Sequence, residues 1–170
     1  MTVYLDMDGV IADFFKGLEV KYNVTHWKDI PDRDNTILAL KGTDFFNTLD
    51  VFPTSQTLVD YVRSIGDWGI CSSPLRGDRD NSAYWKRVWL LRNGFMPDIN
   101  KLLFTGQKEI FAVDKLDGSP NILVDDKPTN IERWTAKGGI GIQYQANEDD
   151  VQILIEKLKS AEKLKKVLKK

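Results

Sequence analysis

The sequence has few of the features that mark a secreted or membrane protein. Cys71 is the single cysteine in 170 residues, so no disulfide can form within the chain. No apolar run approaches the roughly 20 residues that a transmembrane helix needs. Carboxylates near the first residues stand where a secretion signal would need a basic and then an apolar stretch. We therefore expect a reducing, cytoplasmic setting, with Cys71 as a small buried residue.

The chain also lacks a net charge that would attract it to nucleic acid or anionic lipid, because its formal charge is only −1. The charge is uneven, however, since residues 157–170 contain seven lysines and one glutamate. Across residues 151–170, apolar residues recur at helical spacing, at Val151, Leu154, Ile155, Leu158, Ala161, Leu164 and Leu168. This spacing predicts an amphipathic helix packed on the core, with a tether for nucleic acid as the alternative.

Five short apolar runs end in small or polar residues, as parallel strands do when chemistry lies at their carboxyl ends. The runs are residues 2–5, 68–71, 102–104, 121–124 and 139–144. Helical patterns lie between them, with one face formed by Leu58, Val59, Val62 and Ile65, and another by Trp85, Val88, Trp89 and Leu91. The alternation predicts an α/β fold with a doubly wound parallel sheet, in which ligands bind outside the carboxyl ends of the strands.

Residues 16–56 break this alternation. They contain Trp27, Pro31, a polar turn at residues 32–35, and Phe45-Phe46 ahead of Pro53. We interpret this segment as a small helical cap, inserted after the first strand and lying over the strand ends. Residues 1–15 and 57–170 would then form the catalytic core.

Carboxylates follow two of the predicted strands, Asp6 and Asp8 after the first and Asp125-Asp126 after the fourth. Because the ends of parallel strands meet at one edge, four carboxylates are expected around one point. Without a cation such a cluster repels itself and its pKa values rise. Mg²⁺, a hard ion that takes oxygen ligands, would neutralise it. The alternative for Asp125-Asp126 is that they stabilise the N-terminus of a helix.

Hydroxyl groups and an ammonium group complete this pattern. Ser72 and Ser73 follow the second strand, and Lys108 comes shortly after the third. Such donors beside a metal ion suit a phosphoryl group, whose oxygens must be neutralised while a nucleophile attacks in line. Ser72 has helix capping as its alternative role. Lys86 competes with Lys108, but its aromatic helical surroundings predict a solvated surface residue or a supporting contact.

These residues resemble a known superfamily. Residues 6–10 (DMDGV) are similar to the DxDG[TV] signature of the haloacid dehalogenase (HAD) phosphatases, and Ser72, Lys108 and Asp125-Asp126 follow in the order of its other three motifs. The closer resemblance is to the 5′(3′)-deoxyribonucleotidases. Their DMDGVLADF, CTSP and LIDDRP segments correspond to residues 6–14, 71–74 and 123–128, and the stretch that closes their cap to residues 44–46. The similarity spans roughly residues 2–145.

The resemblance implies a role for each motif. Asp6 would be the nucleophile that becomes an aspartyl-phosphate, and Asp8 the general acid and then the base. Mg²⁺ would be held by Asp6, by the main-chain carbonyl of Asp8, and by Asp125 or Asp126. Ser72, Ser73 and Lys108 would bind the phosphoryl oxygens, and Gly9 would allow the chain to turn closely around them.

The resemblance also implies a small phosphomonoester as substrate, namely a nucleoside 5′- or 3′-monophosphate. Phe14, Trp27 and Phe45 would line its pocket, with burial in the cap's own core as the alternative. His26 is expected on the surface. Two positions depart from the family, because Gly106 stands where an arginine precedes the third-motif lysine, and Lys127 replaces an arginine after the acidic pair.

Two other functions use similar residues. A receiver-type signalling module also combines clustered acids, a hydroxyl, a lysine and Mg²⁺, but its acidic groups lie closer together in sequence than Asp6 and Asp125 do. A phosphatase acting on polynucleotide ends would explain the lysine-rich segment. The four motifs in order favour the small-molecule phosphatase.

Overall fold

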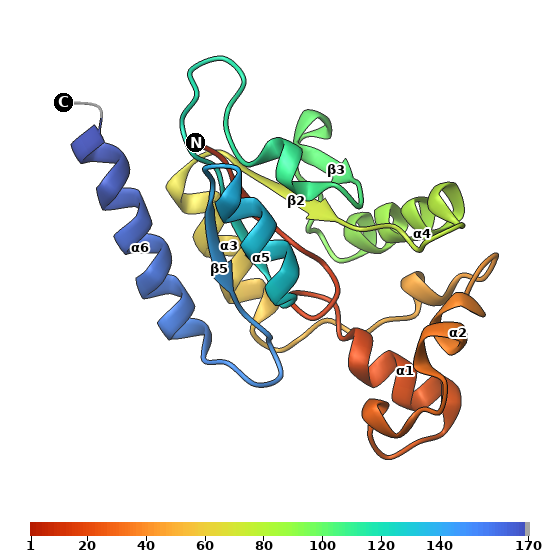
Figure 1. Cartoon of the computed structure of the whole chain (residues 1–170). Coiled ribbons are helices and arrows are strands. Elements are labelled where there is room, and N and C mark those ends of the chain that lie inside the picture. Colours follow the sequence, from red (N-terminus) through yellow and green to blue (C-terminus); the bar gives the residue numbers. More distant parts are fainter. Residues whose placement is uncertain (169–170) are drawn as a thin grey trace.

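The structure is a computed structural model that describes the backbone of residues 1–168 and the side chains of residues 1–163. Its centre is a sheet of five parallel strands in the order β3-β2-β1-β4-β5 (Figure 1). The strands are β1 (Val3–Leu5), β2 (Trp68–Ser72), β3 (Leu102–Phe104), β4 (Ile122–Asp125) and β5 (Ile140–Gln143). All five predicted strands and their parallel pairing are confirmed.

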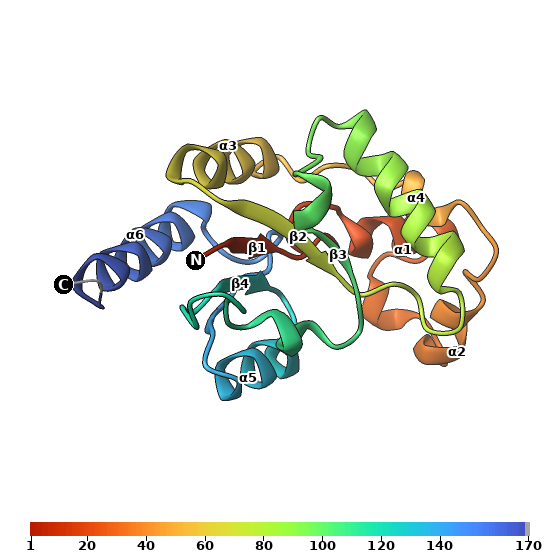
Figure 2. The ribbon, with the colours of Figure 1, turned by 90° about the horizontal axis from the view of Figure 1, so that it is seen from above.

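Helices cover both faces of the sheet (Figure 2). On one side lie α3 (Ser55–Ile65) and α6 (Val151–Leu168), which contact each other, and on the other lies α5 (Pro128–Ala136). Further along the sheet are α4 (Arg79–Arg92) and the short 3₁₀ helices η3 (Ile99–Lys101) and η4 (Lys108–Phe111). This is the doubly wound α/β arrangement that the sequence predicted.

The predicted helix faces are largely confirmed. Leu58, Val59 and Val62 of α3 are fully buried. In α4, Trp89 is buried, but Leu91 is 60% exposed and Leu90 is buried in its place. The prediction for Leu91 was wrong because the buried face of α4 follows positions 82, 86, 89 and 90, one helical stripe that excludes residue 91.

A helical segment joins β1 to α3 and lies beyond the carboxyl end of β1 (Figure 1). It contains α1 (Phe14–Tyr22), η1 (Trp27–Asp29), α2 (Arg33–Leu38) and η2 (Phe45–Asn47). Its second half is tied to α4, because Nε1 of Trp89 donates to the Leu49 carbonyl at 2.7 Å and Arg92 donates to the Asn47 carbonyl at 2.6 Å. The segment is therefore helical, as predicted, and firmly attached to the core on one side.

The last helix is amphipathic, as its spacing predicted. Val151, Leu154, Ile155, Leu158 and Ala161 are buried, whereas Lys157, Lys159 and Lys163 are exposed. The predictions for the side chains of Leu164 and Leu168 lie outside the described residues. Within the described part of the chain, no helix combines the length and apolar character that a membrane span requires.

Candidate active site

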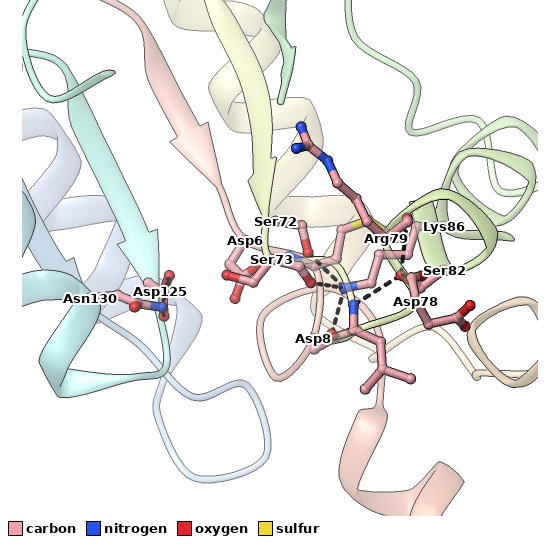
Figure 3. Close-up of polar contacts among 12 residues, drawn as sticks. Asp6, Asp8, Ser72, Ser73, Asp78, Arg79, Ser82, Lys86, Asp125 and Asn130 are labelled. Atoms are coloured by element: carbon pink, nitrogen blue, oxygen red, sulfur yellow. Dashed lines mark hydrogen bonds and ion pairs between the residues drawn. The ribbon is translucent and has the colours of Figure 1, made fainter. Parts of the chain in front are cut away.

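The strand register brings the predicted site residues to one edge of the sheet. Leu5 lies opposite Ile70 on one side and Val124 on the other, so the chain leaves β1, β2 and β4 at neighbouring points. Figure 3 shows Asp6, Asp8, Ser72 and Ser73 near one another, with Asp125 across the site. Gly9 follows in the turn after β1. The close approach of these groups, which lie up to 119 residues apart, follows directly from the parallel topology.

Lys108 joins the first and fourth motifs. Its Nζ atom lies 3.0 Å from Oδ1 of Asp6 and 2.6 Å from Oδ2 of Asp125, and the residue is 2% exposed. Burial alone would lower the pKa of Lys108, but the two carboxylates raise it above its usual value. Lys108 therefore carries a fixed positive charge between the two acids, where the third motif was predicted.

Lys86 adopts the second of the two positions expected for it, a supporting contact to predicted site residues. It is fully buried, and its Nζ atom donates to Oδ2 of Asp8 at 2.7 Å, to Oγ of Ser72 at 2.9 Å and to the Ser73 carbonyl at 3.0 Å (Figure 3). The expected alternative of a supporting contact is therefore confirmed and that of a solvated surface lysine is wrong, because these three oxygens compensate the desolvation of the ammonium group. The signal available in the sequence was its position on the same helical stripe as Trp89.

The two acids of the fourth motif have different surroundings. Asp125 is fully buried and accepts hydrogen bonds from the main-chain N of Lys127 at 2.9 Å, from Nδ2 of Asn130 at 3.0 and 3.1 Å, and from Lys108. The side chain of Asp126 accepts no hydrogen bond from the described residues. Burial first, and then Asp6, Asp125 and Asp8, raise the pKa of Asp126 to about 8. The sequence analysis did not predict the contact of Asn130 with Asp125. The available indication was that Asn130 lies in the first turn of the helix that follows the acidic pair.

Three carboxylates form a group that fits a metal ion. Asp6, Asp125 and Asp126 each place an oxygen within 4.8 Å of the other two. Gly9, at φ +80°, permits this, since a Cβ atom there would lie 2.6 Å from Oδ2 of Asp126. A set made only of oxygen donors, with one acid left without a counter-charge, fits a hard cation such as Mg²⁺. Asp8 was predicted to hold the metal through its main-chain carbonyl, and its side chain lies outside this group and pairs with Lys86.

The two carboxylate oxygens of Asp8 are not equivalent. Oδ2 accepts the hydrogen bond from Lys86, while Oδ1 is buried and has no hydrogen-bond partner among the described residues. Burial raises the pKa of Asp8, Lys86 opposes that effect, and Asp6 adds to it. The net shift is upward, which favours the protonated form that a general acid needs.

A cavity of about 490 Å³ opens beside Asp8, between the helical segment and the loop after β2. Its lining consists of Asp8, Phe14, Asp34, Ile37, Leu38, Phe46, Ser73, Pro74, Leu75, Arg76 and Lys127. The cavity therefore combines apolar walls with a few charged groups next to the acids, as small-ligand sites do.

Of the three aromatic residues predicted to line the pocket, Phe14 is in the lining. Phe45 is buried behind it, with ring centroids 5.8 Å apart, and Phe46 occupies the lining position instead. The ring of Trp27 packs at a tilt against that of Phe15, with centroids 4.9 Å apart, and lies under the guanidinium group of Arg33; Trp27 is not in the cavity lining. The alternative role in the packing of the helical segment therefore describes Trp27 and Phe45.

Two further expectations are confirmed. His26 is exposed, and its Nδ1 atom accepts a hydrogen bond from the main-chain N of Lys28. Cys71 is a buried free cysteine, and burial raises the pKa of its thiol to about 12. Both residues thus lie outside the chemistry of the site.

Comparisons with known proteins agree with this geometry. No protein-family model matches the chain. The mitochondrial 5′(3′)-deoxyribonucleotidase of Mus musculus is 26% identical over 153 aligned residues, which cover 75% of this chain and 65% of that protein. The match therefore spans less than two thirds of the relative's length.

Solved structures share the fold at low sequence identity. A hydrolase from Streptococcus pneumoniae TIGR4 is 12% identical with a TM-score of 0.55, over 93% of this chain and 97% of that one. A HAD-superfamily hydrolase from Geobacter sulfurreducens PCA is 12% identical with a TM-score of 0.51, over 85% and 89% of the two chains. The chain has the α/β fold of HAD-superfamily hydrolases.

Proposed function

We propose that the chain is a Mg²⁺-dependent phosphomonoesterase that hydrolyses (deoxy)ribonucleoside 5′- or 3′-monophosphates through an aspartyl-phosphate. The main support is the arrangement around Asp6, which has Lys108 at 3.0 Å and two more carboxylates within 4.8 Å. The similarity to the deoxyribonucleotidase suggests the nucleotide. The deduced cytoplasmic location is part of the same proposal.

Asp6 is suited to act as the nucleophile. Its Oδ1 atom accepts from the main-chain N of Met7 at 2.8 Å and faces Lys108, so Oδ2 is the oxygen left to attack phosphorus. A new bond forms between Oδ2 and phosphorus as the bond to the ester oxygen breaks, and Asp8 gives its proton to the departing oxygen. Water then attacks the aspartyl-phosphate, Asp8 accepts a proton from that water, and Asp6 is released with inorganic phosphate.

Ser72 and Lys108 each retain one hydrogen for the phosphoryl group. The Ser72 hydroxyl accepts from Lys86, which leaves its own O–H free to donate. Lys108 pairs with Asp6 and Asp125, so one of its three N–H groups has no partner among the described residues. Ser73 lines the cavity beside them. These donors would hold the phosphoryl oxygens as charge builds on them.

Asp6, Asp126 and the main-chain carbonyl of Asp8 would hold Mg²⁺. The bound ion would supply positive charge that neutralises the phosphoryl oxygens. Asp126 is the better candidate of the fourth-motif pair because its carboxylate is free, whereas Asp125 is occupied by Lys108, Lys127 and Asn130. Asp125 would then act mainly by holding Lys108 in place.

The cavity and the helical segment suggest how the substrate is enclosed. We interpret residues 16–56 as a cap whose Phe46, together with Phe14 at its base, gives an apolar wall on which a base can stack. Arg76 and Lys127 line the same cavity and add positive charge. With Gly106 in place of the family arginine, these two cations are the available partners for further anionic groups of the substrate.

Phosphate release from a panel of 5′- and 3′-nucleoside monophosphates, measured with and without Mg²⁺, tests the proposal. Release is expected for at least one nucleotide, only with Mg²⁺, and not from the Asp6→Asn variant. A protein that releases no phosphate from any member of the panel, although it is folded and supplied with Mg²⁺, would contradict the proposed function.

A further inference from the structure

Lys86 uses all three hydrogens of its ammonium group inside the site. They go to Oδ2 of Asp8, Oγ of Ser72 and the carbonyl of Ser73, at 2.7, 2.9 and 3.0 Å. An ammonium group has three donors and no acceptor, so none is left for a phosphoryl oxygen. Lys108, in contrast, has two partners and one remaining hydrogen. The two buried lysines therefore have different tasks, and that of Lys86 is not phosphate binding.

The partners of Lys86 come from two neighbouring strands. Asp8 follows the end of β1, whereas Ser72 and Ser73 lie at the end of β2 (Figure 3). Lys86 itself belongs to a third element, α4, and binds all three oxygens at once. It thereby fixes the carboxylate of Asp8 relative to the hydroxyl of Ser72.

The position of Lys86 is itself well defined. One turn before it, Oγ of Ser82 donates to the Asp78 carbonyl at 2.7 Å and accepts from the main-chain N of Leu75 at 2.9 Å. Less than one turn after it, Trp89 is hydrogen bonded to Leu49. The ring of Phe46, from the helical segment, lies 4.7 Å from the ammonium nitrogen and covers it with its π face.

We propose that Lys86 is a positioning residue for Asp8, and that Phe46 links this positioning to the helical segment that bounds the substrate cavity. This inference rests on the proposed function. Oδ1 is buried and has no hydrogen-bond partner among the described residues, so the bond from Lys86 to Oδ2 is what fixes the carboxylate that faces the leaving group. Without Lys86, the carboxylate can rotate, and proton donation to the leaving group is no longer aligned.

The dependence on the leaving group tests this inference. An alkoxide such as that of a nucleotide leaves only with a proton from Asp8, whereas p-nitrophenolate leaves without one. The ratio kcat/KM reports the steps up to departure of this group, so later hydrolysis of the aspartyl-phosphate does not mask the effect. The measurement uses thymidine 5′-monophosphate and p-nitrophenyl phosphate with saturating Mg²⁺.

Lys86→Met is expected to lower kcat/KM for the nucleotide about 100-fold and for p-nitrophenyl phosphate less than about 5-fold, since general acid catalysis contributes roughly 10²- to 10⁴-fold. Arg87→Met, at an exposed position of the same helix, is the matched control and should change neither value. Because Lys86 acts through Asp8, Lys86→Met should cost little more in an Asp8→Asn background. Equal losses on the two esters, or fully additive losses in the double variant, would overturn the inference.

Two further measurements keep the test decisive. If Lys86→Met does not fold, Phe46→Leu retains the ammonium group and should lower kcat by up to about tenfold, again on the nucleotide only. The readout is kcat because Phe46 also lines the cavity, and a change confined to KM would report lost stacking alone. Absence of a nucleotide-selective loss there would also overturn the inference. If the wild type hydrolyses neither ester, the proposed function fails, and crystal structures of wild type and Lys86→Met decide the positioning alone. A changed Asp8 orientation is expected, and an unchanged one would refute it.

Discussion

Oδ2 of Asp125 lies 2.6 Å from the ammonium group of Lys108, and both residues are almost completely buried. This pair is the basis for our proposal that Asp125 has a structural role and Asp126 a metal-binding one. Breaking a buried ion pair leaves an uncompensated charge and costs roughly 3–5 kcal/mol. We expect the lower value, about 3 kcal/mol, because Lys108 keeps Asp6 as a second partner. Asp125→Asn should therefore lower the free energy of unfolding by about this amount, as measured by urea denaturation.

The adjacent substitution is the matched comparison. Asp126→Asn removes a carboxylate that has no hydrogen-bond donor among the described residues and that lies beside three other acids. We expect the metal-free protein to be at least as stable as wild type, but Mg²⁺ binding in calorimetry to weaken more than about tenfold. Loss of a direct ligand should cost at least as much as loss of a ligand's supporting partner, which costs roughly 10- to 100-fold. The opposite result, with Asp125→Asn losing the metal and Asp126→Asn losing stability, would reverse the assignment.

The stability of the metal-free protein should depend on pH through Asp126. Its pKa is raised from 3.8 to about 8, so between these values the folded state binds more protons than the unfolded state. The contribution of Asp126 to the free energy of unfolding is therefore fully present below about pH 4 and is lost as the pH rises towards 8. In EDTA, thermal melting temperatures should fall from pH 5 to pH 8, and the slope should be smaller in Asp126→Asn.

Asp6→Asn should abolish turnover. The amide keeps the shape of the side chain but cannot attack phosphorus, so kcat should fall by several orders of magnitude, on the order of 10⁴ or more. Beryllium fluoride, which imitates an aspartyl-phosphate, should inhibit the wild type and not bind to the variant. Substantial phosphate release by Asp6→Asn would exclude the covalent mechanism.

The sequence predicts the fold and the acidic cluster well, for a physical reason. Buried parallel strands are continuous apolar runs, and their carboxyl ends share one edge, so residues such as Asp6 and Asp125 are brought together by topology alone. Lys108, which begins η4 shortly after β3, belongs to the same class of strand-end residues. These positions need no knowledge of side-chain packing.

What the sequence did not reveal depends on packing. Lys86 lies on a helix, and only the rotation of α4 decides whether its ammonium group faces water or Asp8. The same holds for Phe45 and Phe46, which are adjacent in a 3₁₀ helix so that only Phe46 lines the cavity. Asn130 reaches Asp125 because α5 begins at residue 128. Pro128 is typical of a helix start, but it does not predict that the side chain two residues later turns back to Asp125.

The lining of the cavity predicts that the ring of Phe14 contacts the base of the substrate. Phe14→Ala should raise KM for nucleotides about 5- to 150-fold, corresponding to about 1–3 kcal/mol of stacking, and should change KM for inorganic pyrophosphate or other small phosphate compounds little. Trp27→Leu is the control, because Trp27 packs against Phe15 and is not in the cavity lining. A larger effect on KM from Trp27→Leu than from Phe14→Ala would place Trp27 in the substrate pocket, as the sequence predicted.

The position of α6 argues for free mononucleotides over polynucleotide ends. Both views place α6 at the opposite end of the molecule from α1 and α2, which lie beside the site (Figures 1 and 2). A strand held by Lys157, Lys159 and Lys163 would have to cross the molecule to reach Asp6. Truncation after Glu156 would remove the buried Leu158 and Ala161, so neutralising the exposed lysines is the cleaner test.

Replacing Lys157, Lys159 and Lys163 with glutamine should leave kcat/KM for a mononucleotide unchanged. Binding through several lysines releases counterions and weakens steeply with salt, whereas a mononucleotide held in one cavity by a few donors depends on salt only weakly. The wild type should therefore hydrolyse a mononucleotide faster than a 5′-phosphorylated oligonucleotide at both 50 and 200 mM salt, the roughly fourfold range over which phosphate contacts are lost. Faster hydrolysis of the oligonucleotide, lost in the triple variant and at high salt, would instead make α6 part of the substrate site.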